Sequence, residues 1–253
     1  MDRNVVERYR LVLFGRMVMG VSHDVDNHLS VVLGFSELIQ LAAGKEQKVR
    51  DGAGKILSSG EKIGAIVQQF SRYVRPHAPS PEPLVPGEMI REILLFSRYD
   101  LGRGNVTVLP PLEVPPGILH ADRRDFGLAL LALLFNAAEA MSETGGELSM
   151  RVSIDAAGWE FTVSDQGPGI PAGFEEKVFE VGFTTRKGPL HMGMGLPVAR
   201  HLAGQAGGTL QLANGSGGGC VATVRLPMKP RAGLAARSAA GSRSNPPFGT
   251  KTK

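Results

Sequence analysis

Hydrophobic residues recur with a helical period along the first third of the chain. Between residues 11 and 42 they lie three or four positions apart, which predicts one long amphipathic helix with apolar residues at positions 11, 14, 18, 21, 25, 32, 35, 39 and 42. A second stripe predicts another helix that ends before Pro76, with apolar residues at positions 49, 53, 56, 63, 67, 70 and 74. The two helices would form a hairpin that turns around residues 43–46.

The predicted hairpin can bury only part of its apolar surface by itself. Pairing with a second copy into a four-helix bundle would cover the rest, so we expect a homodimer. The alternative is that the hairpin packs on the C-terminal part of its own chain.

The pattern changes after residues 76–87, PHAPSPEPLVPG, whose five prolines are typical of a linker. Beyond them we expect helices at 87–100, 122–143 and 196–207, and strands at 105–109, 117–120, 147–155, 159–165, 208–213 and 220–227. The expected fold class is an α helical hairpin followed by an α+β two-layer sandwich, with helices on one face of a mixed sheet. The corresponding domains are a hairpin at 1–78, a linker at 79–87, a sandwich at 88–228 and a tail at 229–253.

The net charge of +4 belongs to the tail. Residues 229–253 hold six Lys or Arg and no acid, whereas the rest of the chain holds 22 basic and 24 acidic side chains. We therefore expect no nucleic-acid partner. The tail is rich in Gly, Ser, Ala and Pro, which predicts a disordered basic segment.

Other features of composition favour a cytoplasmic protein. The single cysteine, Cys220, excludes an internal disulfide and a cysteine-based zinc site. No apolar run approaches the roughly 20 residues that cross a bilayer, and the charged start is unlike a secretory signal.

Four segments of the predicted sandwich suggest a nucleotide site. Asn136 lies in an apolar helix, where its amide oxygen could ligate Mg²⁺. Asp165 ends a strand before DQGPGIP, where a carboxylate could accept a hydrogen bond from an adenine amine. Gly193 and Gly195 precede a helix whose amides suit phosphate, and GSGGG forms a turn before the last strand. Each feature alone has an ordinary structural explanation, namely a core Asn, an Asp-Gly turn or a glycine loop.

In their order and spacing, these segments resemble the N, G1, F and G2 boxes of bacterial two-component sensor histidine kinases, most closely the nitrogen-regulator type. The resemblance implies that ATP and Mg²⁺ are bound, with Asn136 as the metal ligand and Asp165 on the adenine amine. It assigns Gly167 and Gly169 to the adenine pocket and Gly193, Gly195 and Leu196 to the phosphate end. Further residues of this nucleotide lid would be Thr184, Thr185, Arg186 and Lys187.

Two histidines in the first helix, His23 and His28, are candidates for chemistry. His23 shares a helical face with polar residues and is expected to point to solvent, whereas His28 lies in the apolar stripe. A nucleophile that meets ATP and then a partner protein must be exposed, which favours His23.

The stretch SHDVDNHL around His23 resembles the H box of the same family. The resemblance implies that Asp24 accepts or orients the ring proton at Nδ1, and that Asn27 orients a water when the partner is dephosphorylated. Departures from the family pattern are His28 in place of the usual proline, Asp26 in place of a basic residue, Ala132 in place of an Asn before Asn136, and Cys220 in place of a threonine.

The expected function is ATP-dependent autophosphorylation of His23, followed by transfer of the phosphoryl group to an aspartate of a response regulator receiver domain. The alternative is a catalytically weak phosphotransfer or scaffold protein that binds a regulator and holds nucleotide as a conformational ligand. A gyrase-type ATPase is disfavoured, because Ala132 stands where its catalytic glutamate would lie. Few residues precede the first helix, so we expect input from a separate sensory protein, from a chain end, or from a sensor outside this sequence.

Overall fold

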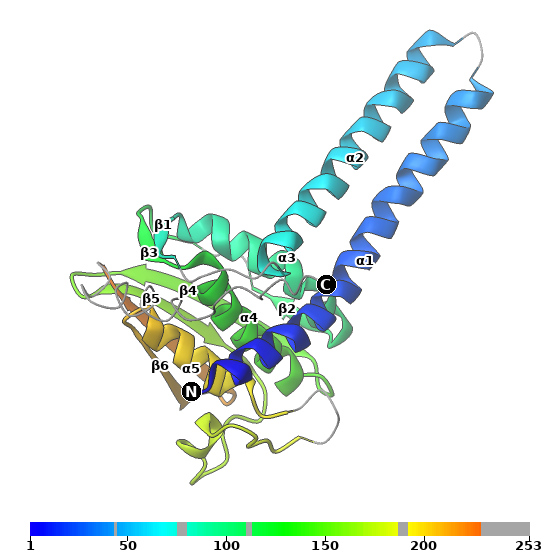
Figure 1. Ribbon diagram of the computed structural model, residues 1–253. Coiled ribbons are helices and arrows are strands. Elements are labelled where there is room, and N and C mark those ends of the chain that lie inside the picture. Colours follow the sequence, from blue (N-terminus) through cyan, green and yellow to red (C-terminus); the bar gives the residue numbers. More distant parts are fainter. Residues whose placement is uncertain (43–44, 75–79, 110–112, 187–191, 229–253) are drawn as a thin grey trace, which may run out of the picture.

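A computed structural model describes residues 1–42, 45–74, 80–109, 113–186 and 192–228. A long helical hairpin projects from a compact domain of helices packed on a β-sheet (Figure 1). The elements of the hairpin are α1 (Arg3–Leu41) and α2 (Glu46–Val74). The elements of the domain are β1 (Glu82–Leu84), α3 (Pro86–Arg103), β2 (Val106–Val108), β3 (Leu119–Ala121), α4 (Arg123–Ala140), β4 (Gly146–Ile154), β5 (Gly158–Ser164), the 3₁₀ turn η1 (Lys177–Phe179), α5 (Gly195–Gln205), β6 (Thr209–Asn214) and β7 (Cys220–Pro227).

The contact between α1 and α2 follows a stricter heptad than the sequence suggested. The α2 residues that face α1 or the domain are buried or half-buried at positions 49, 52, 56, 59, 63, 66, 70 and 73. Ala53 and Val67, which the sequence placed on the same apolar stripe, are exposed in the single chain and do not face α1. Gly52 explains part of the shift, because a Cβ atom there would lie 2.9 Å from the Ile39 side chain. Small residues at this face let the two helices approach closely.

The first half of α1 packs on the domain instead of continuing the hairpin seam. Its buried residues are Val6, Tyr9, Arg10, Leu13, Phe14 and Met17. Leu11 and Val18 were predicted in the apolar stripe, but they are 69% and 45% exposed. The prediction is wrong there because the stripe that packs is set by the partner surface, which the periodicity of one helix cannot identify. Helix α1 also begins at Arg3, eight residues before the predicted start, with Asp2 accepting a hydrogen bond from the Asn4 amide as an N-cap.

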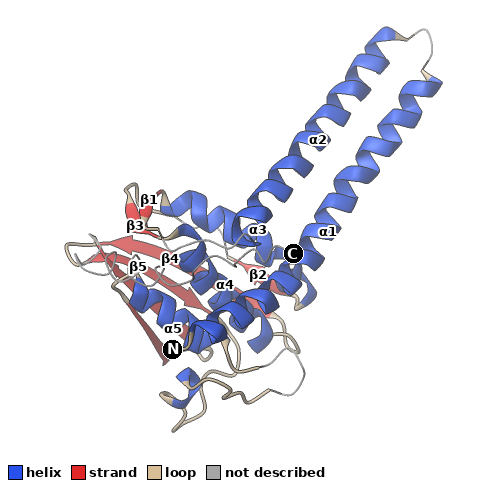
Figure 2. Ribbon diagram, viewed as in Figure 1, coloured by secondary structure: helices blue, strands red, loops and turns tan. Residues whose placement is uncertain are grey.

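Five strands form a mixed sheet in the order β2-β4-β5-β7-β6. Strands β2 and β4 are parallel and the other neighbours are antiparallel. Alternate residues of β4, β5 and β7 are buried, so one face of the sheet is apolar. Helices α3, α4 and α5 lie on that face (Figure 2). The hairpin and two-layer sandwich are therefore confirmed as the fold class, whereas pairing of two hairpins stays a prediction.

The sandwich begins earlier than predicted. Strand β1 lies within the stretch 79–87 that was predicted as a linker, and it pairs antiparallel with β3 so that Leu84 faces Leu119. Both leucines are buried. The prolines of this stretch misled the prediction, because proline is tolerated in a short edge strand. The predicted tail, 229–253, lies outside the described residues.

No helix in the described ranges is both long enough and apolar enough to span a membrane.

Candidate nucleotide site and phosphoacceptor helix

A cleft opens between α4, the segment after β5, the start of α5 and the first turns of α1. Its lining includes Asn136 and Asp165, together with Gly169, Thr184, Thr185, Arg186, Gly193, Gly195 and Leu196. These residues come from four separate segments of the sequence. The structure thus brings these nine predicted residues around one hollow.

Asp165 follows β5 and lies at the inner end of the cleft. Its Oδ1 atom accepts hydrogen bonds from the amides of Gly167 at 2.9 Å and Cys220 at 3.1 Å. Burial raises the pKa of this carboxyl group, and the two amides and the positive charge of Arg186 partly oppose that effect. The Oδ2 atom accepts no hydrogen bond from the described residues, so Asp165 is held in place with one oxygen available to a ligand.

The glycines after Asp165 have different tasks. Gly169 lines the cleft with φ +73°, and a Cβ atom there would lie 2.7 Å from Asn214 Oδ1. Gly167 is not part of the described lining. It packs against α4, where a Cβ atom on this glycine would lie 2.7 Å from the Cβ atom of Ala140. Asn214 fixes the loop, since it accepts from the Ile170 amide and donates to the Ile170 carbonyl. Asn214 was not predicted, because only the fold brings β6 beside this loop.

Asn136 projects from the middle of α4 into the cleft. It is half-buried in a helix whose neighbouring residues from Phe126 to Phe135 are buried, and its amide makes no hydrogen bond to the described residues. A core Asn would be hydrogen-bonded. An amide oxygen facing a polar cleft instead fits a hard cation such as Mg²⁺.

The opposite end of the cleft suits an anion. Helix α5 starts at Gly195, and its N-cap residue Met194 makes no side-chain hydrogen bond to the first turn. The positive end of the helix dipole and these amides therefore face the cleft. Thr184 hydrogen-bonds to the Arg186 amide at 3.1 Å, which shapes the segment before the lid. Lys187 lies outside the described residues.

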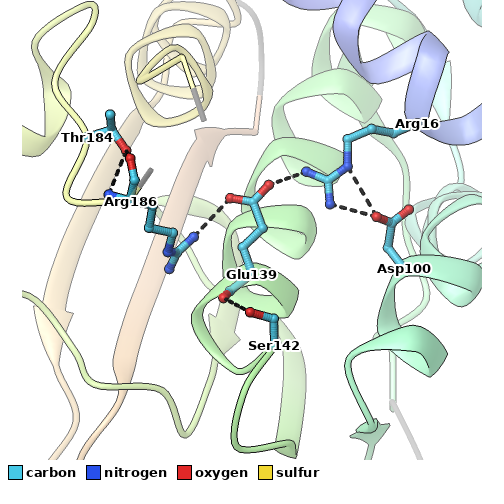
Figure 3. A network of polar contacts seen from close by, with 6 residues as sticks. All are labelled: Arg16, Asp100, Glu139, Ser142, Thr184 and Arg186. Atoms are coloured by element: carbon cyan, nitrogen blue, oxygen red, sulfur yellow. Dashed lines mark hydrogen bonds and ion pairs between the residues drawn. The ribbon is translucent and has the colours of Figure 1, made fainter. Parts of the chain in front are cut away.

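Arg186 belongs to a chain of charges across the cleft (Figure 3). It donates to Glu139 Oε2 at 2.9 Å, and the other carboxylate oxygen of Glu139 accepts from Arg16. Arg16 also donates to Asp100 at 2.7 Å and stacks over Phe135. Burial disfavours the charge of Arg16, but its two carboxylate partners outweigh burial and raise its pKa. Glu139 thus joins Arg186 of the predicted nucleotide lid to Arg16 of the stalk, the helical hairpin formed by α1 and α2.

These contacts involve residues that the sequence analysis did not select. Glu139 carries a weak signal, because it is an acid one helical turn after Asn136 in an apolar helix. Tyr9 and Arg16 carry none, since their role depends on how α1 docks. Tyr9 is buried, and its hydroxyl lies where a Cβ on Gly195 would come within 2.9 Å.

His23 lies farther along α1, outside the described lining of the cleft. Its side chain is 59% exposed, whereas His28 is half-buried, as the helical faces predicted. Asn27 Nδ2 lies 3.3 Å from His23 Nδ1. Asp24 Oδ1 is 3.6 Å from the same nitrogen, too far for a hydrogen bond. Seven residues separate His23 from Arg16, which corresponds to about 10 Å along the helix.

Residues of the domain contact the surroundings of His23. Arg98 on α3 donates to Asp24 at 2.8 Å. The ring of Tyr99, also on α3, lies 5.9 Å from the imidazole. In this arrangement the histidine faces α3 and not the cleft.

Known proteins match this architecture. Residues 121–230 match the family described as histidine kinase-, DNA gyrase B- and HSP90-like ATPases. The C4-dicarboxylate transport sensor protein DctB of Rhizobium meliloti (strain 1021) is 26% identical over 222 residues, which are 86% of this chain and 35% of DctB. The signal transduction histidine-protein kinase AtoS of Escherichia coli (strain K12) is 23% identical over 230 residues, 91% of this chain and 37% of AtoS. The chain thus spans about a third of the length of these relatives.

A solved structure shares both parts of the fold. Histidine kinase ThkA, solved in complex with the response regulator protein TrrA, is similar with a TM-score of 0.53 and 22% identity over 89% of this chain and 65% of that one. This likeness concerns the fold. Residues 121–230 thus form the part of the chain that matches the ATPase family, and the two relatives that match most of the chain are named as a sensor protein and a histidine-protein kinase.

Proposed function

We propose that the protein is an ATP-dependent histidine kinase that phosphorylates His23 and passes the phosphoryl group to an aspartate of a receiver domain. One observation carries the proposal: a single chain joins a cleft lined by Asn136 and Asp165 to a helix that exposes His23 beside a carboxylate. The chain's similarity to AtoS, which is named as a histidine-protein kinase, supports it.

The first step would be an in-line displacement. Nε2 of a neutral His23 forms a bond to the γ-phosphorus while the bond from that phosphorus to ADP breaks. Nε2 has a free lone pair only when the ring proton is on Nδ1, the nitrogen nearest to Asp24. Asp24 would accept or orient this proton after it separates from Arg98.

The cleft residues would orient the nucleotide. The free oxygen of Asp165 would accept from the adenine amine, and Arg186 and the first turn of α5 would contact the phosphates. Mg²⁺, held by the Asn136 oxygen, would supply charge neutralisation on the phosphates.

In the second step, an aspartate of a receiver domain would attack the phosphorus, the P–N bond would break, and the imidazole would be regenerated. ThkA was solved with a response regulator protein, which supports this class of partner. In dephosphorylation of the partner, Asn27, one turn after His23, would orient a water that attacks the phosphorus of the phosphoaspartate, so that inorganic phosphate leaves and the aspartate is regenerated. The proposed substrates, ATP and a receiver protein, support a cytoplasmic location for the reaction.

We also propose that two hairpins pair into a four-helix bundle. Large apolar side chains are exposed along both helices of the hairpin, namely Leu29, Leu33, Leu38, Leu41, Leu57 and Val67. A second hairpin would cover such a surface.

Incubation of the full chain with Mg²⁺ and ATP tests the kinase activity. With the label on the γ-phosphate the protein should acquire radioactivity that is stable in base and lost in acid, as expected of a phosphorylated imidazole. With the label on the α-phosphate it should acquire none. Binding of nucleotide without any transfer of γ-label would contradict the kinase and favour the scaffold alternative.

A further inference from the structure

The first turns of α1 occupy the mouth of the nucleotide cleft. Tyr9, Val12, Leu13 and Arg16 form one wall of it, although they belong to the stalk and not to the ATPase domain. The open space that remains is about 150 Å³. Ligand pockets usually hold roughly 300 to 1,000 Å³. The docked helix therefore leaves less room than a nucleoside triphosphate needs.

Two residues of α1, Tyr9 and Arg16, contact the cleft residues that the proposed function assigns to the phosphates, directly in the case of Tyr9 and through Glu139 in the case of Arg16. The Tyr9 hydroxyl lies against Gly195, the first residue of α5, where the helix amides point into the cleft. Arg16 and Arg186 share the carboxylate of Glu139 (Figure 3). A triphosphate that recruits Arg186 competes directly with this carboxylate, because each phosphate oxygen offers the same type of charged acceptor.

Ion pairs fix α1 in this place along its length. Arg10 pairs with Asp125 at 2.7 Å, with each side chain about 10% exposed, and Arg16 pairs with Asp100 at 2.7 Å. Two turns beyond, Asp24 pairs with Arg98. The same docking that narrows the cleft therefore keeps the surroundings of His23 against α3.

We propose that residues 6–17 of α1 act as an autoinhibitory strap, which closes the nucleotide cleft through Tyr9 and through the Arg16–Glu139–Arg186 latch. The proposal rests on the proposed function of the cleft as an ATP site. The docked form is a resting state in which the cleft is closed and His23, although exposed, is held beside α3 and away from the cleft. Because only the open fraction binds nucleotide, the apparent affinity of the whole protein is lowered by that fraction.

Nucleotide binding by variants of the full chain tests the strap. Titration calorimetry with Mg·AMP-PNP, a triphosphate that cannot transfer its γ-phosphate, should give Arg16→Gln and Tyr9→Ala an affinity about fivefold to tenfold higher than that of the wild type. Arg8→Gln is the matched control, because Arg8 is exposed on the same helix beside Tyr9, and its affinity should equal the wild-type value. Equal or weaker binding by both strap variants overturns the proposal, since their side chains would then be neutral or favourable toward nucleotide.

Hydrogen exchange gives a second readout that needs no substitution. Addition of Mg·AMP-PNP to the wild type should increase deuterium uptake in residues 3–20, because the strap leaves the cleft. Increased protection of these residues would show that α1 clamps the nucleotide, and would overturn the strap. Tighter binding by the strap variants without γ-label on the protein would contradict the kinase alone. Unchanged binding with γ-label on the protein would contradict the strap alone.

Discussion

Arg98 on α3 donates a 2.8 Å hydrogen bond to Asp24, the residue next to His23 on α1. The bond joins the carboxylate proposed to orient the imidazole to a guanidinium on α3. While it persists, Asp24 remains 3.6 Å from His23 Nδ1 and makes no hydrogen bond to it.

Removal of this guanidinium should release Asp24. We expect Arg98→Gln to autophosphorylate about twofold to tenfold faster, with a change in unfolding free energy below about 1 kcal/mol, because Arg98 is 68% exposed and exposed ion pairs stabilise little. Initial rates of γ-phosphate incorporation measure the effect. Arg103→Gln, which removes an exposed arginine from the end of the same helix, should leave the rate unchanged. A slower Arg98→Gln protein would mean that Arg98 assists the reaction.

Asp165→Asn should weaken nucleotide binding by about tenfold to a hundredfold, the value of a hydrogen bond to a charged group. After the substitution the remaining side-chain oxygen can still accept from the Gly167 and Cys220 amides, so the new NH₂ group replaces the free oxygen and meets the adenine amine donor to donor. Asp155→Asn is a matched control, since Asp155 Oδ1 accepts from the amides of Ala157 and Gly158 in a turn away from the cleft. Calorimetry with Mg·AMP-PNP compares the nucleotide affinities of the two variants. Equal affinities would show that Asp165 does not bind the nucleotide.

Gly193→Ala should damage the lid more than an ordinary glycine substitution. Gly193 has φ +60°, and a Cβ there would overlap the Phe183 carbonyl oxygen. We expect a loss of about 2 kcal/mol or more in stability, together with weaker nucleotide binding. Gly173→Ala is the control. Gly173 has a similar φ of +83°, but an added Cβ atom would have no neighbour within 4 Å, so this variant measures only the cost of the backbone conformation, about 1 kcal/mol. Urea unfolding of both variants measures the difference, and equal losses would show that crowding at Gly193 is unimportant.

Cys220 should react slowly with alkylating reagents. Burial, and then the charge of Asp165, raise the pKa of its thiol to about 11. The folded protein therefore keeps this proton between about pH 9 and 11, where the unfolded chain loses it, so this group lowers stability as the pH rises through that range. Iodoacetamide labelling should be slow at pH 8 and accelerate toward pH 11. Mg·AMP-PNP should slow it further, because Cys220 lines the cleft; rapid labelling at pH 8 would contradict the burial.

Local pattern predicted most of the ATPase domain. The alternation in β4, β5 and β7 and the apolar run of α4 identified these elements within a few residues, because each has one buried face that its own sequence reveals. Asn136, Asp165 and Gly193 were selected because each breaks the pattern of its element; the structure places all three on one cleft, and their role in binding stays a prediction.

Tertiary partners explain what the sequence did not predict. Leu11 was assigned to the apolar stripe, yet Leu13 is buried instead, because Leu13 lies on the face of α1 that packs on the domain. Glu139 and Arg16 are far apart in the sequence, and nothing local marks them as a pair. Strand β1 was missed since its burial depends on pairing with β3.

The location of the phosphoryl group tests the central claim most directly. The full chain should be labelled with Mg²⁺ and γ-labelled ATP, digested at neutral or basic pH, and mapped by mass spectrometry. His23→Gln should abolish the label, whereas His28→Gln should retain it on the peptide that contains residue 23. Label that persists in a folded His23→Gln protein, or that maps to another residue, would contradict the account.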